Sequence, residues 1–134
     1  MIHRLTDSLN FQAEALVLRS ERQRLIASNI ANADTPGYVA RDMDFATALR
    51  QATAQAPNAG AMAATAAGHV QSAAGARIEA QLRYATPSQT NLDRNTVDMD
   101  RERASFADNS VKYEATLRFI NGSVRTLTSA ITGQ

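Results

Sequence analysis

The chain contains neither cysteine nor tryptophan, and it has only four phenylalanines and three tyrosines among its 134 residues. Without cysteine, neither a disulfide framework nor a thiolate metal site can form. So few large side chains leave little area for a compact core, because the abundant alanine buries little surface per residue. The sequence therefore excludes a disulfide-stabilised module and predicts that the larger apolar groups are concentrated in part of the chain.

An excess of charge of one sign and long apolar runs are also absent. Fourteen basic residues against thirteen acidic ones give a formal net charge of +1, which provides no field that would attract nucleic acid or an anionic membrane surface. No apolar run of about 18 residues occurs, and the first residues form no continuous apolar h-region of a cleavable signal peptide. We therefore expect no nucleic-acid partner, no direct membrane insertion and, if the protein is exported, a route that reads no such signal.

The residue types that could form a catalytic or metal site are scattered along the sequence. His3 and His69 have no Cys or His partner at metal-ligand spacing. Asp98, Asp100 and Glu102 alternate as in a calcium loop, but the glycine and the final glutamate that an EF-hand needs at fixed positions are missing. No Gly-x-Ser-x-Gly element and no Gly-rich phosphate loop occurs. We therefore expect no catalytic residues, no metal site and no cofactor, and thus a protein that is not an enzyme.

A seven-residue repeat runs through both ends of the chain. Near the C-terminus, eight of ten positions are apolar or aromatic: Met99, Arg103, Phe106, Ser110, Tyr113, Leu117, Ile120, Val124, Leu127 and Ile131. Near the N-terminus, six of nine are apolar: Ile2, Leu5, Leu9, Gln12, Leu16, Arg19, Gln23, Ile26 and Ile30. Such a repeat places one stripe along one side of a helix. The residues alone leave open a coiled-coil seam and an ordinary amphipathic helix in a small bundle. We expect Asn95 or Thr96 to cap the second helix.

Between these ends the chain changes character. Residues 51–76 contain no Asp, Glu, Lys or Arg and twelve alanines, with a proline and three glycines among them, which indicates a flexible or poorly ordered insertion. A two-residue alternation follows and predicts a short strand paired in a hairpin, with apolar positions at Ile78, Ala80, Leu82 and Tyr84. We expect one domain with an N-terminal helix over residues 1–33, a turn, insertion and β segment over 34–96, and a C-terminal helix over 97–132.

The segment from Ser28 to Tyr38 carries a strong stop signal for the first helix. Pro36 cannot continue a helix, and Pro36-Gly37 suits the central positions of a type II turn. Asn29 and Asn32 lie three apart on one helical face, where their amides have two possible uses. One is to bind the last free carbonyls of the helix, and the other is to contact a neighbouring subunit.

This segment resembles the N-terminal signature of the axial proteins of the bacterial flagellum, the rod, hook and hook–filament junction family, in which Asn-Leu/Ile-Ala-Asn precedes Thr-Pro-Gly-Tyr/Phe. The stretches after Tyr38 and from Asn95 to Glu102 are similar to the proximal rod proteins in particular. The resemblance covers roughly residues 1–50 and 93–131. One position departs from the pattern, because Arg94 stands where that family usually has glycine before Asn-Thr-Val, which places the tight turn there in doubt.

The resemblance implies a mainly α fold with long N- and C-terminal helices packed as a coiled-coil-like pair and a small irregular or β-hairpin middle segment. It implies helix packing and assembly through Leu5, Leu9, Leu16, Ile26, Ile30, Met99, Phe106, Tyr113, Leu117, Ile120, Val124, Leu127 and Ile131. It also implies that the first helix is ended, and the turn docked, by Asn29, Asn32, Thr35, Pro36, Gly37 and Tyr38.

The same resemblance implies a structural subunit of the proximal rod of the flagellar basal body, which joins the membrane-embedded MS ring and the export gate to the drive shaft. The implied partners are other copies of the chain, the ring-to-rod adaptor protein, other proximal rod proteins and components of the export gate. The implied location is the periplasmic rod, reached through the flagellar type III apparatus without a cleaved signal peptide. Two other classes remain open: a soluble coiled-coil adaptor or export chaperone, and a small cell-wall hydrolase.

Overall fold

A computed structural model describes residues 2–54, 82–84 and 92–133, with the side chains of residues 2–5, 82 and 83 outside the description. Along the chain the elements are α1 (Ile2–Ala31), β1 (Arg41–Met43), α2 (Phe45–Ala54), β2 (Leu82–Tyr84) and α3 (Met99–Thr132). The helix α2 was not predicted. Most of the predicted insertion at 51–76, and the alternating residues before Leu82, lie outside the described residues.

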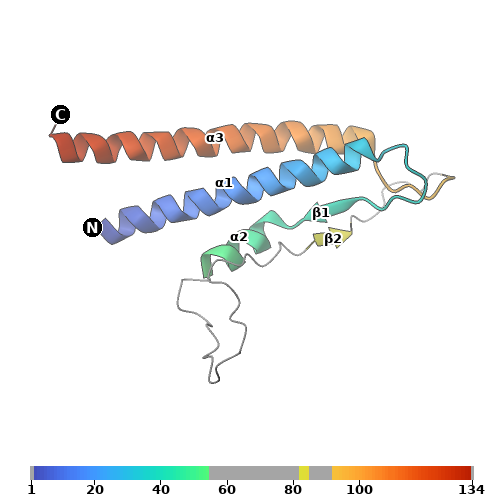
Figure 1. Cartoon of the computed structure of the whole chain (residues 1–134), viewed down its shortest axis with the longest axis horizontal. Coiled ribbons are helices and arrows are strands. Elements are labelled where there is room, and N and C mark those ends of the chain that lie inside the picture. Colours follow the sequence, from blue (N-terminus) through green and yellow to red (C-terminus); the bar gives the residue numbers. More distant parts are fainter. Residues whose placement is uncertain (1, 55–81, 85–91, 134) are drawn as a thin grey trace, which may run out of the picture.

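The two long helices α1 and α3 run antiparallel and side by side (Figure 1). Both chain ends therefore lie at the same end of the molecule, and the turn that follows α1 lies at the other. The helices are closest where α1 ends and α3 begins, and they diverge toward the termini. The expectation of a mainly α fold built on a pair of long terminal helices with a small middle segment is confirmed.

Helix α3 is delimited by a cap at each end. Its N-cap is Asp98, whose side chain accepts the backbone N–H groups of Asp100 and Arg101, both at 3.2 Å. The prediction that Asn95 or Thr96 caps this helix was therefore wrong. At the other end, Gly133 adopts φ 74° and donates its N–H to the Ser129 carbonyl at 2.9 Å, which is the left-handed stop that glycine favours.

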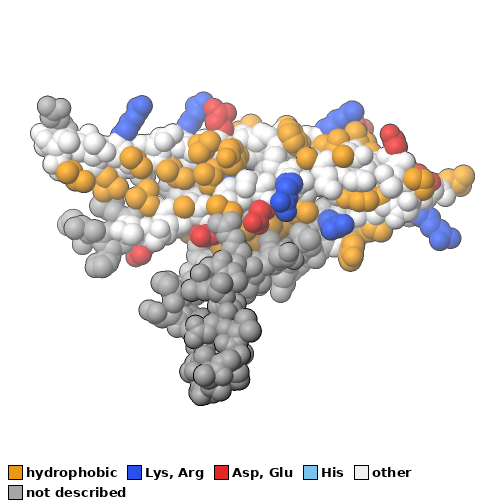
Figure 2. All heavy atoms as spheres, viewed as in Figure 1, with side chains coloured by type: hydrophobic (Ala, Val, Ile, Leu, Met, Phe, Trp, Pro, Cys, Tyr) orange, Lys and Arg blue, Asp and Glu red, His pale blue; other side chains and the backbone are white. Residues whose placement is uncertain are grey.

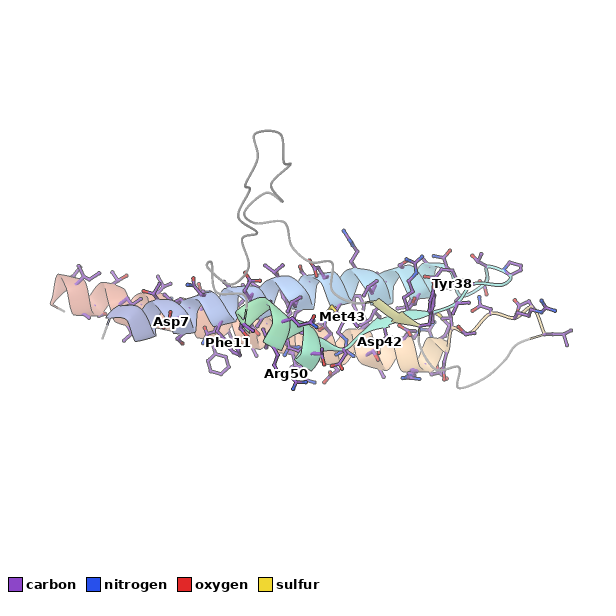
Figure 3. All side chains as sticks on the ribbon, turned by 90° about the horizontal axis from the view of Figure 1, so that it is seen from below. Asp7, Phe11, Tyr38, Asp42, Met43 and Arg50 are labelled. Carbon is purple, nitrogen blue, oxygen red and sulfur yellow. The ribbon has the colours of Figure 1, made fainter. Side chains whose placement is uncertain are left out.

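The middle of the chain folds onto the side of α1 that faces away from α3. The strands β1 and β2 pair antiparallel, with Arg41 opposite Tyr84 and Met43 opposite Leu82, and the chain between them includes α2. The Asp44 side chain accepts the backbone N–H and the hydroxyl of Thr47, at 3.2 and 2.9 Å, which stabilises the first turn of α2. Figure 3 shows β1 and α2 lying along α1 with Asp42 and Met43 at the corner between them.

The main apolar core lies between α1 and α2. Its buried members are Leu18, Met43 and Ala48, and partly buried apolar residues pack around them: Leu25, Phe45, Leu49 and Ala52. The contact between α1 and α3 combines apolar and polar residues. Its buried residue on α3 is polar, Asn109, whereas buried Ile26 lies on α1.

Candidate assembly site

A small polar cluster joins α1 to α3. Asn109 is 1% exposed, and its side-chain amide donates to the Arg19 carbonyl at 2.9 Å and to Gln23 Oε1 at 2.6 Å. Gln23 in turn donates from Nε2 to Ser110 Oγ at 2.8 Å. Asn109 Oδ1 has no hydrogen-bond partner among the described residues. Because these bonds are directional and buried, sliding either helix by one turn would leave several of these groups unpaired, so the cluster fixes the register.

Two arginines on α1, Arg19 and Arg22, connect this helix to the corner between β1 and α2. The Arg19 guanidinium lies 4.2 Å from the centre of the Phe45 ring, a cation–π contact. Burial lowers the pKa of Arg19, the nearby Arg22 adds to this and Asp108 opposes it, yet a guanidinium remains charged at any physiological pH. Arg22 Nε lies 3.8 Å from Asp42 Oδ1. Helix α1 is therefore held from both sides, by α3 and by the β1–α2 corner.

The predicted packing residues on α1 fall on or near its contact faces. Ile26 is buried, at 3% exposure. Leu9, Leu16 and Ile30 are half-buried, and the side chain of Leu5 lies outside the described part of the chain.

The predicted packing residues on α3 divide into two groups. The half-buried ones are Met99, Tyr113, Leu117, Ile120 and Leu127. The exposed ones are Phe106 at 40%, Val124 at 48% and Ile131 at 84%. Within a single chain, the α3 repeat is therefore only partly covered.

A rotation of the repeat relative to the contact explains this division. The α3 side that faces α1 is marked by buried Asn109 and by half-buried small or polar residues such as Ser105, Thr116 and Ser123. At 3.6 residues per turn, the predicted repeat is centred roughly 80° to one side of that line. We call the resulting strip the apolar shoulder, and it comprises Phe106, Leu117, Val124 and Ile131 of α3 with Leu9 and Leu16 of α1.

The apolar shoulder follows the boundary between the two helices on one face of the molecule. In an antiparallel pair, the handedness of the helices brings the α1 and α3 members to the same side, opposite the side that α2 covers. Figure 2 shows hydrophobic side chains gathered along this boundary, most densely toward the termini. Apolar side chains that remain exposed or half-buried along a helix pair are typical of a surface that another helix covers.

Near the C-terminal end of α1, the Asn29 side chain binds the segment that follows the turn. It is 1% exposed, donates to the Arg41 carbonyl at 2.7 Å, and accepts from the Arg41 N–H at 3.1 Å and from the Tyr38 hydroxyl at 3.2 Å. An amide that meets both backbone groups of one residue imitates a strand partner. Asn29 is thus used within the chain, on a segment twelve residues away, and it does not cap the final carbonyls of its own helix.

Asn32 and the turn close the helix locally. The Asn32 amide donates to the Ser28 carbonyl at 2.8 Å, and Asn32 Oδ1 accepts the Thr35 hydroxyl at 3.2 Å. The Tyr38 N–H donates to the Thr35 carbonyl at 3.2 Å, and Gly37 has φ 72°. With proline at the second position, this geometry is a type II turn. The chain thus makes the type II turn that Pro36-Gly37 suits, and the Asn32 amide binds a carbonyl of its own helix.

The most connected residue at this end is Asn95, which sequence reasoning had assigned to the wrong helix. It is fully buried, and its Nδ2 lies 2.9, 2.7 and 2.9 Å from the carbonyl oxygens of Asn32, Ala33 and Thr35. Its Oδ1 accepts the Val97 N–H at 2.8 Å. Asn95 therefore binds the turn just after α1, although it precedes α3 in the sequence, and the carbonyls of Asn32 and Thr35 also accept a backbone N–H from within that turn.

Arg94 occupies a backbone conformation that favours glycine. Its φ is 61°, and no other non-glycine residue in the described part of the chain has a positive φ. Both neighbours are tethered, because the Asp93 carbonyl accepts the Gly37 N–H at 2.8 Å and Asn95 binds the turn after α1. The tight turn is therefore kept despite the arginine, at a conformational cost of about 1 kcal/mol.

The pKa of one carboxyl beside Asn29, that of Glu102, is shifted. Burial raises the pKa of Glu102, a hydrogen bond with the Asn29 side chain opposes that rise, and the nearby Asp42 adds to it. Farther along α3 the charges are on the surface, where the hydrogen bond from Lys112 lowers the pKa of Asp108.

No group of three or more His, Cys, Asp or Glu side chains is placed to hold a metal ion within residues 2–54, 82–84 and 92–133. None of the helices described is both long and apolar enough to cross a membrane. The arrangement provides a helix pair whose register is fixed around Asn109, a hydrogen-bonded turn at one end and an apolar shoulder.

These features define an elongated, two-helix protein with an apolar strip suited to lateral contact with other helices. A family described as "Flagella basal body rod protein" matches residues 9–38, which include most of α1 and the whole turn motif. The chain is 47% identical to flagellar basal body rod protein FlgB of Proteus mirabilis strain HI4320 over 98% of both chains. It is 46% identical to FlgB of Escherichia coli K12 over 93% of both chains, and 41% identical to FlgB of Cereibacter sphaeroides over 96% of both.

The chain therefore belongs to the FlgB family of flagellar basal body rod proteins. This confirms the resemblance stated from the sequence and makes the protein a structural rod subunit of the flagellar basal body, in a family that is not one of enzymes. As a rod component, it assembles with other basal body proteins.

Proposed function

We propose that this chain forms part of the proximal rod, joins the MS ring and the export gate to the drive shaft, and lines the channel through which later subunits are exported. Its partners in this role are other copies of itself, the ring-to-rod adaptor protein, other proximal rod proteins and export-gate components. It reaches the rod through the flagellar type III apparatus.

The observation that carries the proposal is the apolar shoulder. A drive shaft must transmit torque, so its subunits need internal rigidity and extensive lateral contact. Two sets of hydrogen bonds supply the rigidity. The polar cluster at Asn109 fixes α3 against α1, and Asn95 fixes the segment before α3 against the turn after α1. The shoulder supplies the contact, because Val124 and Ile131 bury their apolar area only when a helix of another subunit covers them.

Two valines on α3 give a matched test of the shoulder. Val124 lies on it at 48% exposure, whereas Val111 is 68% exposed and points away from both α1 and the shoulder. Neither side chain is needed for the fold of the single chain, so Val124→Asp and Val111→Asp should leave the circular dichroism spectrum unchanged. We expect Val124→Asp to abolish rods and swimming, and Val111→Asp to retain them. Swimming in both variants, or equal loss in both, would contradict the assignment of assembly to the shoulder.

A deletion strain tests the position in the rod. If the chain forms the first segment above the ring, cells that lack it should contain MS rings with no rod attached, as seen by electron microscopy of purified basal bodies. Rods that extend beyond the ring in the deletion strain would rule out a proximal position. The same experiment separates the rod subunit from an adaptor or export chaperone, whose loss would reduce the number of complete rods without leaving every ring bare.

A further inference from the structure

A single Asn-Gly pair occurs in the sequence, at Asn121–Gly122, and it lies within α3. Both residues are exposed. A Cβ added at Gly122 would meet no atom within 4 Å, so no close approach within the chain requires glycine there. Glycine in a helix interior is nevertheless the least favourable residue after proline. The pair is thus a weak point in the helix that the packing of this chain does not explain.

The part of α3 beyond the pair, residues 123–132, is here called the distal segment. Seven of its ten residues are Ser, Thr, Val or Ile, which have lower helix propensity than Ala or Leu. Thr126 and Thr128 donate their hydroxyls to carbonyls four residues earlier, at 3.0 and 2.9 Å, which tends to bend a helix. The i,i+4 ion pairs of α3, Asp108–Lys112 and Glu114–Arg118, both precede the Asn-Gly pair.

Tertiary contacts hold the distal segment weakly. Only Ser123 and Leu127 are half-buried and the other residues from 124 to 132 are exposed, while α1 and α3 diverge in this region (Figure 1). Segments with few buried apolar contacts open at low free energy, independently of the rest of the fold. The distal segment therefore opens more readily than the part of α3 held by the polar cluster at Asn109.

We propose that Asn121–Gly122 is a site of spontaneous deamidation, and that opening of the distal segment controls its rate. In the reaction, the Gly122 backbone nitrogen attacks the Asn121 side-chain carbonyl carbon and forms a five-membered succinimide. The bond from that carbon to Nδ2 breaks and ammonia leaves, carrying the proton from the Gly122 nitrogen. Water then opens the ring to aspartate or isoaspartate. No oxidant, metal or enzyme is needed.

The geometry of the helix explains why opening of the distal segment controls the rate of deamidation. Within α3 the Gly122 N–H lies along the helix axis and donates to a carbonyl one turn earlier, so its nitrogen is not aimed at the Asn121 side chain. The attack requires local loss of that hydrogen bond. Glycine makes it faster once the helix is open, because no side chain shields the nitrogen.

Other asparagines of the described residues are protected by structure or by the residue that follows. Asn29, Asn95 and Asn109 are buried, with their amides hydrogen-bonded. Asn10 is exposed on α1 but precedes Phe11, so it is an internal control with similar solvent access and a bulky neighbour.

Conversion would have a mechanical effect. Isoaspartate adds a methylene to the backbone and so interrupts the helical hydrogen bonds between the ion-paired part of α3 and the distal segment. The distal segment carries Val124 and Ile131 of the apolar shoulder, so an altered chain would present this surface in the wrong direction. Subunits that wait unassembled would lose competence with time. This consequence rests on the proposed function, whereas the chemistry is measured on the isolated chain.

The test is incubation of the purified full chain in warm, mildly alkaline buffer, followed by peptide mass mapping and an isoaspartate assay. We expect aspartate and isoaspartate to accumulate at Asn121 and not at Asn10, and faster in urea than in native buffer. Gly122→Ala should suppress the reaction. Thr126→Ala with Thr128→Ala leaves the Asn-Gly pair intact and should slow the reaction in native buffer roughly tenfold, from the helix propensity gained, with no effect in urea.

Each contrary result overturns part of the proposal. An intact Asn121 after conditions that convert it fully in urea would show that the distal segment does not open. Equal rates in native buffer and urea, or no slowing in the Thr126→Ala and Thr128→Ala variant, would show that the helix exerts no control. Because assembly is absent from this assay, its failure is distinguishable from failure of the rod proposal.

Discussion

Replacing Asn95 with alanine tests the hydrogen bonds that join the segment before α3 to the turn after α1. The amide nitrogen of Asn95 serves the carbonyls of Asn32, Ala33 and Thr35, and its oxygen serves the Val97 N–H. Asn95→Ala removes all of these partners from a fully buried position.

The magnitude follows from the groups left unpaired. A buried polar group without a partner costs about 1–3 kcal/mol. The carbonyls of Asn32 and Thr35 keep a backbone N–H donor, so the Ala33 carbonyl and the Val97 N–H are the groups that lose their partner, and we expect a total loss of about 3 kcal/mol. For a chain of this size that corresponds to a fall in Tm of about 10 °C.

Asn95→Asp is the matched control for this prediction. Aspartate has the same shape and keeps an oxygen for Val97, but it directs a carboxylate oxygen at three carbonyls. At neutral pH it should destabilise the fold at least as much as alanine does, with partial recovery in acid, where the protonated carboxyl regains a donor. The assay is thermal unfolding followed by circular dichroism. A Tm for Asn95→Ala within about 2 °C of the parent, which corresponds to well under 1 kcal/mol, would refute the reasoning.

Three further predictions concern single residues. Arg94→Gly should stabilise the chain by up to about 1 kcal/mol, since glycine adopts positive φ without the Cβ clash; Arg94→Ala keeps the Cβ and should give no gain in the same urea titration. Burial raises the pKa of Glu102 in the folded chain. The buried charge of Glu102 therefore does not destabilise the fold below the pKa of the unfolded state, and its destabilising effect appears as the pH rises through the pKa of the folded state. Glu102→Gln should therefore match the parent in Tm near pH 4, about the pKa of an unfolded glutamate, and exceed it at neutral pH; a constant difference across this range would contradict the shift. Phe45→Leu should cost about 1 kcal/mol by removing the ring under Arg19, whereas Phe45→Tyr keeps the ring and should be nearly neutral; equal losses would show that the cation–π contact contributes little.

The sequence predicted what depends on local pattern. The heptad spacing indicated both long helices, and Pro36-Gly37 indicated the type II turn, because proline and glycine restrict or permit specific backbone angles whatever surrounds them. The local role of Asn32, which binds the carbonyl of Ser28, was also within reach of the sequence.

The sequence did not predict what depends on distant partners. Asn95 binds carbonyls at least 60 residues earlier, and no local pattern distinguishes that role from a helix cap. The true cap, Asp98, stood three residues further on. Helix α2 had a readable signal, Asp44 ahead of apolar Phe45, Ala48 and Leu49, but it lies next to the alanine-rich stretch and was grouped with the irregular middle.

The rotation of the α3 repeat was hidden for a related reason. A stripe of apolar residues predicts a buried face, but the sequence does not say which neighbour buries it. Small polar residues at Ser105 and Thr116 and the amide of Asn109 form the side toward α1, and such residues carry no periodic hydrophobic signal. The repeat therefore identified the existence of a contact surface and not its orientation.

The antiparallel pairing of β1 with β2 has a practical consequence for labelling. It holds Met43 opposite Leu82, so the two ends of the chain between the strands lie at neighbouring points. The entropic cost of closing a loop grows only logarithmically with the number of residues in it, so doubling the loop length costs about 0.6 kcal/mol. An epitope or fluorophore-accepting tag placed between Ala54 and Leu82 should therefore leave the helix pair intact, which offers a way to mark individual subunits in living, rotating motors.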